Sequence, residues 1–159
     1  MRKVLPSLLT VVALLSFCAD TYGQTEIRFD RWYFNDANGR PKIIRISNDT
    51  EMNNAAILSF IKNEQGKIHL VYSAHSLKNS KQKSHKITFS AGSFVHTLDF
   101  KPWLAMELIS DTSDTEAVAQ LFKSFDMVFV SINDGKKRHF DNTKFNKNYK
   151  KLLKAKAEK

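Results

Sequence analysis

A tight turn near the carboxyl end of the chain is the sequence feature that most restricts its fold. Residues 133–135 read Asn-Asp-Gly, and Asp-Gly between two β-rich runs is among the strongest short signals of a hairpin. The run before the turn, residues 126–132, reads D-M-V-F-V-S-I, and residues 137–140 supply the return strand. The sequence therefore predicts an antiparallel hairpin whose turn occupies residues 133–136.

Helical patterns flank this hairpin on both sides. Residues 114–125 repeat apolar side chains at helical spacing, which predicts a helix with one face in the core. Residues 143–157 follow the hairpin with a second helical pattern that is rich in lysine. The predicted N-cap residues are Asp114 or Thr115 for the first helix and Asp141 or Thr143 for the second.

The upstream part of the chain consists of short β-rich runs separated by polar turn residues. The predicted strands are residues 26–34, 42–47, 55–62, 67–73, 84–89, 94–100 and 103–110. Many short strands followed by late helices are typical of an α+β fold. We therefore expect a mostly antiparallel β-sheet or sandwich with two helices in the C-terminal third.

The amino-terminal residues have the pattern of a cleaved signal peptide. Residues 1–3 are a short basic head, residues 4–17 are largely apolar, and Thr21-Tyr22-Gly23 places small residues before a cut. The apolar run is shorter than the ~20 residues that span a bilayer. We expect a signal peptide at 1–23, a β-rich domain at 24–142 that includes helix 114–125, and a basic amphipathic helix and tail at 143–159. This organisation predicts a periplasmic or secreted protein.

Cys18 raises a second interpretation of the leader. The residues Leu15-Ser16-Phe17-Cys18 resemble the lipid attachment site of bacterial lipoproteins, but the bulky Phe17 departs from the small residue that such sites carry before the cysteine. We therefore assign Cys18 to the discarded signal. The mature chain would then contain no cysteine, which excludes disulfides, thiol nucleophiles and zinc–cysteine sites.

The charge of the predicted mature chain is concentrated at its carboxyl end. Residues 24–135 contain 13 Lys and Arg residues and 13 Asp and Glu residues, so their net charge is zero. Residues 136–159 contain ten Lys and Arg residues against Asp141 and Glu158, a net charge of +8. This layout describes a neutral body with one cationic segment, and it bears on partners rather than on the fold.

A search for catalytic motifs favours a protein that is not an enzyme. The sequence has no nucleophile elbow, no phosphate-binding glycine loop, no His-Glu-x-x-His motif and no Cys-His pairing. His69, His85 and His96 would suit zinc or copper if neighbouring strands brought them together, although isolated histidines explain them more simply. Asp111 and Asp114 fit helix capping better than acid–base chemistry. We expect no cofactor and no metal, and a hydrolase with an unrecognised site stays an alternative.

The second helix carries the residues that we predict to contact a partner. Its apolar side is formed by Phe145, Tyr149, Leu152 and Lys156 at helical spacing, with Leu153 beside them. The predicted contact residues are Lys144, Lys147, Lys150, Lys151 and Lys154. A plainer interpretation is that the helix docks on its own domain and that these lysines form a solvated face.

Several partners suit a lysine-rich face on an exported domain. An acidic protein, an anionic envelope polymer and an anionic membrane surface all qualify. Nucleic acid is not expected, because stacking aromatic residues are not interleaved with the lysines. We predict an exported, non-enzymatic binding domain that contacts a macromolecular partner through its basic C-terminal helix. The alternative is a periplasmic inhibitor or immunity protein that acts against a secreted enzyme or toxin.

The carboxyl third also resembles a known group of exported domains. Its order is a helix at 116–125, a strand at 127–132, a strand containing Phe140 and a short helix opened by Phe145, with Trp32 early in the mature chain. This order is similar to that of the invasion-associated locus B type domains and of some type VI secretion accessory proteins. Those domains usually carry cysteines, and a glycine opens the helix where this chain has Lys144. The resemblance implies an exported β-rich binding domain and assigns no functional residue.

Overall fold

The computed structural model describes residues 30–37, 40–48, 55–78, 80–111 and 115–156. The predicted signal peptide with Cys18, the first residues of the strand predicted at 26–34, and the predicted cap Asp114 lie outside these ranges. Within the described ranges the fold consists of nine strands, one 3-10 helix and two α-helices.

Nine strands form one antiparallel sheet in the order β1-β2-β3-β4-β7-β6-β5-β8-β9. The strands are β1 (Tyr33–Ala37), β2 (Arg40–Ile46), β3 (Ala56–Lys62), β4 (Ile68–Ala74), β5 (His85–Ala91), β6 (Phe94–Pro102), β7 (Glu107–Ser110), β8 (Met127–Ile132) and β9 (Arg138–Asp141). The helices are the 3-10 helix η2 (His75–Leu77) and the α-helices α2 (Thr115–Ser124) and α3 (Phe145–Lys154). The prediction of an α+β fold with a largely antiparallel sheet and two late helices is confirmed.

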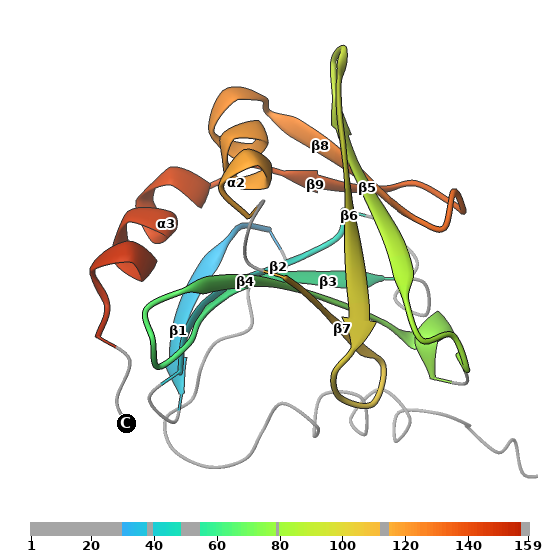
Figure 1. The fold of residues 1–159 in the computed structure, drawn as a ribbon. Coiled ribbons are helices and arrows are strands. Elements are labelled where there is room, and N and C mark those ends of the chain that lie inside the picture. Colours follow the sequence, from blue (N-terminus) through green and yellow to red (C-terminus); the bar gives the residue numbers. More distant parts are fainter. Residues whose placement is uncertain (1–29, 38–39, 49–54, 79, 112–114, 157–159) are drawn as a thin grey trace, which may run out of the picture.

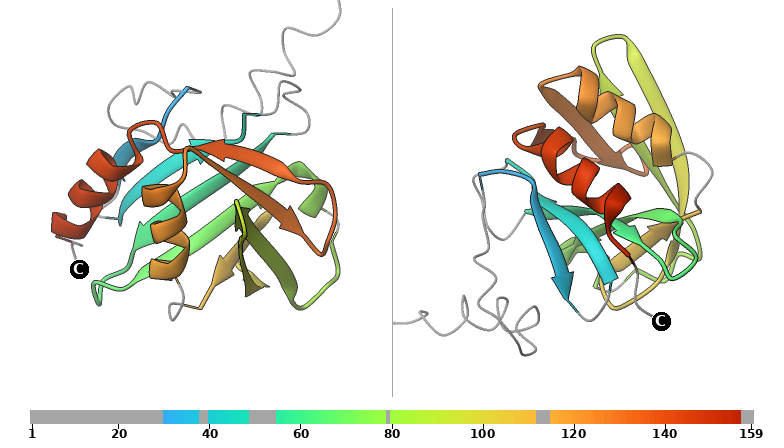
Figure 2. Two further views of the ribbon diagram at one scale, coloured as in Figure 1. Left: turned by 90° about the horizontal axis from the view of Figure 1, so that it is seen from above. Right: turned by 90° about the vertical axis from the view of Figure 1, so that its left-hand side faces the viewer.

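The sheet bends so that its two ends face each other. In Figure 1, β8 and β9 lie above β1–β4, and the long β5–β6 hairpin stands between these two parts and joins them. The two views in Figure 2 show α2 and α3 together at one side of the bent sheet. The helices therefore cover the opening that the bend leaves on that side.

Hydrogen bonds fix the bend by joining the start of the described chain to β9. The backbone N–H of Trp32 donates to the carbonyl of Thr143 at 2.9 Å, and its indole Nε1 donates to the carbonyl of Asp141 at 2.8 Å. The N–H of Asn48, just after β2, donates to the carbonyl of His139 at 2.8 Å. Trp32 and Asp141 are 109 positions apart in the sequence, and these bonds hold their segments side by side.

An aromatic cluster fills the space between the helices and the sheet. The ring of Trp32 lies 5.6 Å from Phe60 of β3, 5.0 Å from Phe122 of α2 and 4.9 Å from Phe145 of α3, measured between centroids. All four side chains are almost completely buried. Such tilted and edge-on aromatic pairs add about 0.5–1.5 kcal/mol each beyond the burial of their surface. One sheet and two helices therefore share a single core.

The Asn-Asp-Gly segment contains a turn where the sequence predicts one. Asn133 and Asp134 have φ values of +47° and +57°, and the N–H of Gly135 donates to the carbonyl of Ile132 at 2.8 Å. Two central residues with positive φ are typical of a type I′ turn. Its central residues are Asn133 and Asp134 rather than the Asp-Gly pair, and the pairing of β8 with β9 ends at Val130 and Arg138. The predicted hairpin between β8 and β9 is confirmed.

The strand predicted at residues 103–110 is wrong in its first half. The chain reverses after Pro102, and β7 begins only at Glu107. The N–H of Trp103 donates to the carbonyl of Glu107, the N–H of Glu107 donates to the carbonyl of Leu104, and Met106 has a φ of +65°. The apolar run that suggested a strand is instead a turn whose Trp103 and Leu104 side chains are exposed.

Candidate functional site

Helix α3 presents the predicted contact residues, and its other side is anchored in the core. Phe145, Tyr149 and Leu152 are buried, as the helical spacing predicts. The Tyr149 ring lies 5.6 Å from Phe60 and 5.3 Å from Phe145. Lys156 was predicted on this apolar side, but α3 ends at Lys154 and Lys156 is exposed beyond it.

Polar contacts fix the orientation of α3 at its middle and its end. The Asn148 amide donates to the carbonyl of Trp32 at 2.6 Å, and the Tyr149 hydroxyl donates to Oε2 of Glu116 at 2.8 Å. The Nζ of Lys62 donates to the carbonyls of Leu153 and Ala155, both at 2.8 Å. The last carbonyls of a helix lack internal partners, so an ammonium group there satisfies them and complements the helix dipole.

The predicted N-cap of α3 is wrong. Lys144 stands at the cap position with a φ of +64° and makes no side-chain capping bond. Asp141 instead accepts a hydrogen bond from the N–H of Thr143 at 2.9 Å, and it also pairs with the guanidinium of the buried Arg45. The Asp141 carboxylate, which the sequence spacing predicted as the cap of the helix, therefore binds Thr143 and Arg45 instead.

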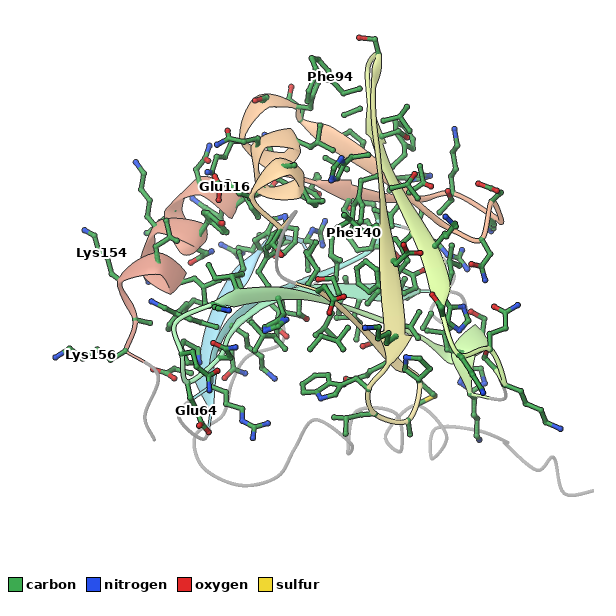
Figure 3. All side chains as sticks on the ribbon, in the orientation of Figure 1. Glu64, Phe94, Glu116, Phe140, Lys154 and Lys156 are labelled. Atoms are coloured by element: carbon green, nitrogen blue, oxygen red, sulfur yellow. The ribbon has the colours of Figure 1, made fainter. Side chains whose placement is uncertain are left out.

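Five lysines form one exposed face of α3, which we call the lysine ridge. The ridge consists of Lys144, Lys147, Lys150, Lys151 and Lys154, all of them exposed. At 3.6 residues per turn they occupy an arc of about 120°, and at 1.5 Å per residue the ridge is about 15 Å long. Figure 3 shows Lys154 projecting away from the body of the molecule. The structure thus brings all five predicted residues to one surface.

No carboxylate in the described part of the chain pairs with the ridge. The salt bridges there are Arg31–Asp30, Arg45–Asp141, Lys101–Asp111 and Lys123–Glu116. The nearest acidic group of α2, Glu116, already accepts hydrogen bonds from Lys123 at 2.7 Å and Gln120 at 2.9 Å as well as from Tyr149. The ridge therefore keeps its positive charge available to a partner.

The contacts of Glu116 also set the ionisation of the groups that join α2 to α3. Burial raises the pKa of Glu116, but hydrogen bonds from Lys123 and Tyr149 outweigh it, and the pKa is lowered. Burial and the neighbouring carboxylate raise the pKa of the Tyr149 hydroxyl well above its usual value. Lys123 also lies over the Tyr149 ring, 4.8 Å from its centroid. The link is therefore a neutral phenol donating to a charged carboxylate.

A second candidate site surrounds the buried His85, which the sequence suggested only as a possible metal ligand together with His69 and His96. An open pocket of about 460 Å³ lies between η2, the start of β5 and the end of β8. The Nε2 of His85 lies 3.2 Å from the hydroxyl of Ser80, and its Nδ1 lies 3.1 Å from the Asn133 amide nitrogen. This order of a serine, a histidine and an amide resembles that of a catalytic nucleophile, its general base and the group that orients the base.

The hydrogen bonds of Asn133 argue against that activity. Its Oδ1 accepts the backbone N–H of Lys86 at 2.9 Å, so its amide nitrogen faces His85 and donates to Nδ1. Burial lowers the pKa of His85 and keeps the ring neutral, and the ring proton must then sit on Nε2. This proton points toward Ser80, so the histidine donates to the serine and does not act as its base.

The remaining candidates from the sequence lie apart from one another. His69 contacts Asn63 and the carbonyl of Ser110, His96 lies on β6 opposite Phe89, and Asp111 pairs with Lys101. Among the described residues, no group of three or more histidine, cysteine, aspartate or glutamate residues is arranged to hold a metal ion.

Neither α-helix in the described ranges has the length and apolar character needed to cross a membrane. No protein-family model, curated protein or solved structure matches this chain significantly.

Proposed function

We propose that this chain is an exported, non-enzymatic binding domain whose lysine ridge contacts an anionic macromolecular partner. One observation carries the proposal: five exposed lysines share one face of a docked helix, and no carboxylate pairs with them in the part of the chain that the structure describes. Because α3 is anchored by Tyr149, Asn148 and Lys62, binding would not require the helix to fold or to leave the core.

The chemistry of the ridge favours a broad anionic surface over a single small ligand. Lysine is a strongly hydrated point charge, whereas arginine provides the planar fork that grips one carboxylate or phosphate. Each lysine held close to an anionic membrane contributes about 1 kcal/mol, and the same long-range attraction acts on an acidic polymer or protein. Binding should therefore weaken as salt screens the charges.

Nucleic acid remains an unfavoured partner. Binding of single strands combines basic residues with aromatic rings on which the bases stack. The exposed aromatic residues Phe94, Trp103 and Phe129 belong to β6, to the turn after it and to β8, and none lies on α3. The ridge offers charge without a stacking surface.

Capture of partners from the organism's own envelope extract tests the proposal. The ridge variant Lys144→Glu/Lys147→Glu/Lys151→Glu/Lys154→Glu should lose the captured partner at low salt, because repulsion replaces attraction. Its control is Lys78→Glu/Lys81→Glu/Lys83→Glu/Lys86→Glu, which changes four exposed lysines in the β4–β5 connection and at the start of β5 and shifts the net charge equally. The control should retain the partner. Equal binding by the ridge variant and the wild type would refute the proposal.

The second candidate function, an exported inhibitor or immunity protein, is favoured by the turn between β6 and β7. Trp103 and Leu104 are exposed in a turn that two backbone hydrogen bonds and the left-handed Met106 hold in place. A projecting apolar turn of fixed shape suits insertion into an enzyme cleft, where aromatic anchors dominate binding. If this function applies, Trp103→Ala/Leu104→Ala should abolish protection against a co-purifying enzyme while the ridge variant retains it.

A further inference from the structure

Strand β6 has a free edge along most of its length. It pairs with β5 from Phe94 to Phe100, but it pairs with β7 only from Phe100 to Pro102. Residues 94–99 therefore have a strand on one side only, as far as the described residues extend. Figure 1 shows the β5–β6 hairpin rising above its neighbours. The backbone groups on such an edge are a ready template for another strand.

The other two edges of the sheet are protected. Edge strand β1 is short and carries the charged Asp36, and helix α3 packs on the same part of the sheet. The edge of β9 receives hydrogen bonds from Asn48 and Trp32 and carries the charged Arg138 and Asp141. Residues 94–98 of β6, by contrast, read F-V-H-T-L and contain no lysine, arginine, aspartate or glutamate, although the chain is rich in lysine. Charged residues and coverage are the usual means by which an edge strand is kept from pairing with another strand. Along residues 94–98 this edge has neither, and the first charged residue is Asp99 at the end of the free segment.

Apolar side chains surround the free edge. Phe94 and Val95 are 60% and 67% exposed, the largest values among the large hydrophobic residues of the described chain. The Phe94 ring lies 5.6 Å from that of Phe125. On the outer face, Val95 and the exposed Phe129 are both in register with Ser90, one on each side of it. An apolar patch beside unpaired backbone groups is typical of a protein-binding surface.

We propose that this edge pairs with the same edge of a second copy, antiparallel and about a two-fold axis at His96. In this register the inner face of one copy's sheet continues into the inner face of the other, and the outer faces do the same. Val95 lies opposite Thr97 of the second copy, and Phe94 lies opposite Leu98 of the second copy. No two like charges face each other across it. A register centred on Thr97 would instead place Val95 opposite Asp99, an apolar side chain against a carboxylate.

The distribution of charge also suits self-association. The lysine ridge on α3 lies apart from β6 in both figures, so the strongest positive charges of the two copies are kept apart. Pairing at β6 leaves the ridge free and is independent of its proposed function.

Sedimentation velocity over a range of protein concentrations tests this pairing. The wild type should form a dimer. The double variant Val95→Lys/Thr97→Lys should be a monomer, because the lysine introduced at position 95 would face the lysine introduced at position 97 of the second copy. The double variant Val95→Glu/Thr97→Glu should be a monomer for the same reason. Both positions are exposed, so unchanged circular dichroism should show that the fold is retained.

An equimolar mixture of the two variants separates pairing from simple damage. Lysine would face glutamate at every substituted position, so the mixture should recover the dimer. Leu104→Lys, which changes an exposed apolar residue in the β6–β7 turn, should remain a dimer. A wild type that stays a monomer at every concentration, double variants that dimerise like the wild type, or a mixture that fails to recover the dimer would each overturn the proposal. A monomer that binds an added extended peptide would assign the edge to a foreign strand and would also overturn it.

Discussion

The hydroxyl of Tyr149 donates a 2.8 Å hydrogen bond to Oε2 of Glu116 and thereby ties the helix that carries the lysine ridge to α2. The same carboxylate accepts Lys123, whose ammonium group also lies over the Tyr149 ring. The orientation of the ridge therefore depends on a phenol and a carboxylate that lie outside it.

Removal of the Tyr149 hydroxyl should loosen this link without disturbing the core. Tyr149→Phe keeps the ring in the aromatic cluster and removes only the donor, so the free energy of unfolding should fall by about 1 kcal/mol. Tyr149→Ala should cost about 3–5 kcal/mol, because it also empties the space that the ring fills. Urea denaturation of both variants measures the difference, and an unchanged stability for Tyr149→Phe would contradict the role given to the hydroxyl.

Two positions on α3, one buried and one exposed, should differ strongly in the stability lost when the side chain is replaced by alanine. Phe145 is buried against Trp32 and Phe122, and Phe145→Ala should destabilise the protein by about 3–5 kcal/mol. Leu153 on the same helix is 50% exposed, and Leu153→Ala should change stability by less than about 1 kcal/mol. Thermal and urea unfolding of the pair test whether α3 is part of the core, and similar costs at both positions would show that it is not.

Lys62 should protect the carboxyl end of α3. Lys62→Met removes the ammonium that satisfies the carbonyls of Leu153 and Ala155, at a cost of about 0.5–1 kcal/mol. Hydrogen exchange should accelerate at the amides of the last turn of α3. Lys67→Met, an exposed lysine in the adjacent β3–β4 turn, serves as the control. Equal exchange in the two variants would exclude the capping role.

The ion pair of Arg45 and Asp141 should make stability depend on acid pH. Burial raises the pKa of Asp141, but hydrogen bonds from Arg45, Asn48 and the Thr143 N–H outweigh it, and the folded pKa is lowered. A lowered folded pKa means that the contribution is complete above the unfolded value of about 3.9 and is lost as pH falls through the folded value.

Asp141→Asn should remove that part of the acid dependence and should cost about 3–5 kcal/mol at neutral pH, because it removes one partner of an ion pair whose guanidinium is buried. Asp99→Asn, on the exposed side of β6, is the control and should have little effect. The urea denaturation midpoints of the wild type and of both variants, measured between neutral pH and pH 2, test this prediction. An Asp141→Asn variant with wild-type stability at neutral pH would contradict the account.

Local features of the sequence predicted local structure well. The Asp-Gly signal located the turn between β8 and β9, although its central residues are Asn133 and Asp134. Helical spacing identified the buried side of α3 with its lysines opposite. The turn at Trp103 was missed because its apolar residues look like a strand when exposure is unknown. The cap role given to Asp141 was wrong because Arg45, 96 positions earlier, competes for the carboxylate.

The arrangement of distant segments could not be predicted from the sequence. Nothing near Lys62 indicates that it meets the end of a helix 91 positions later. The insertion of β7 between β4 and β6, which leaves most of the β6 edge free, follows from pairings that no local pattern specifies. The contact between Ser80 and His85 has short sequence separation, but Asn133, which fixes the histidine tautomer, joins it only through the pairing of β5 with β8.

The salt dependence of partner binding tests the central claim most directly. With the partner captured from the envelope, the dissociation constant is measured over a series of salt concentrations for the wild type and for variants in which one, two and four ridge lysines are replaced by glutamine. Salt weakens binding by screening the charges that attract the partner. The slope of log Kd against log salt should therefore become smaller with each lysine removed. The matched series at Lys78, Lys81, Lys83 and Lys86 should leave the slope unchanged. A slope that is the same in the ridge series and the wild type would contradict the account.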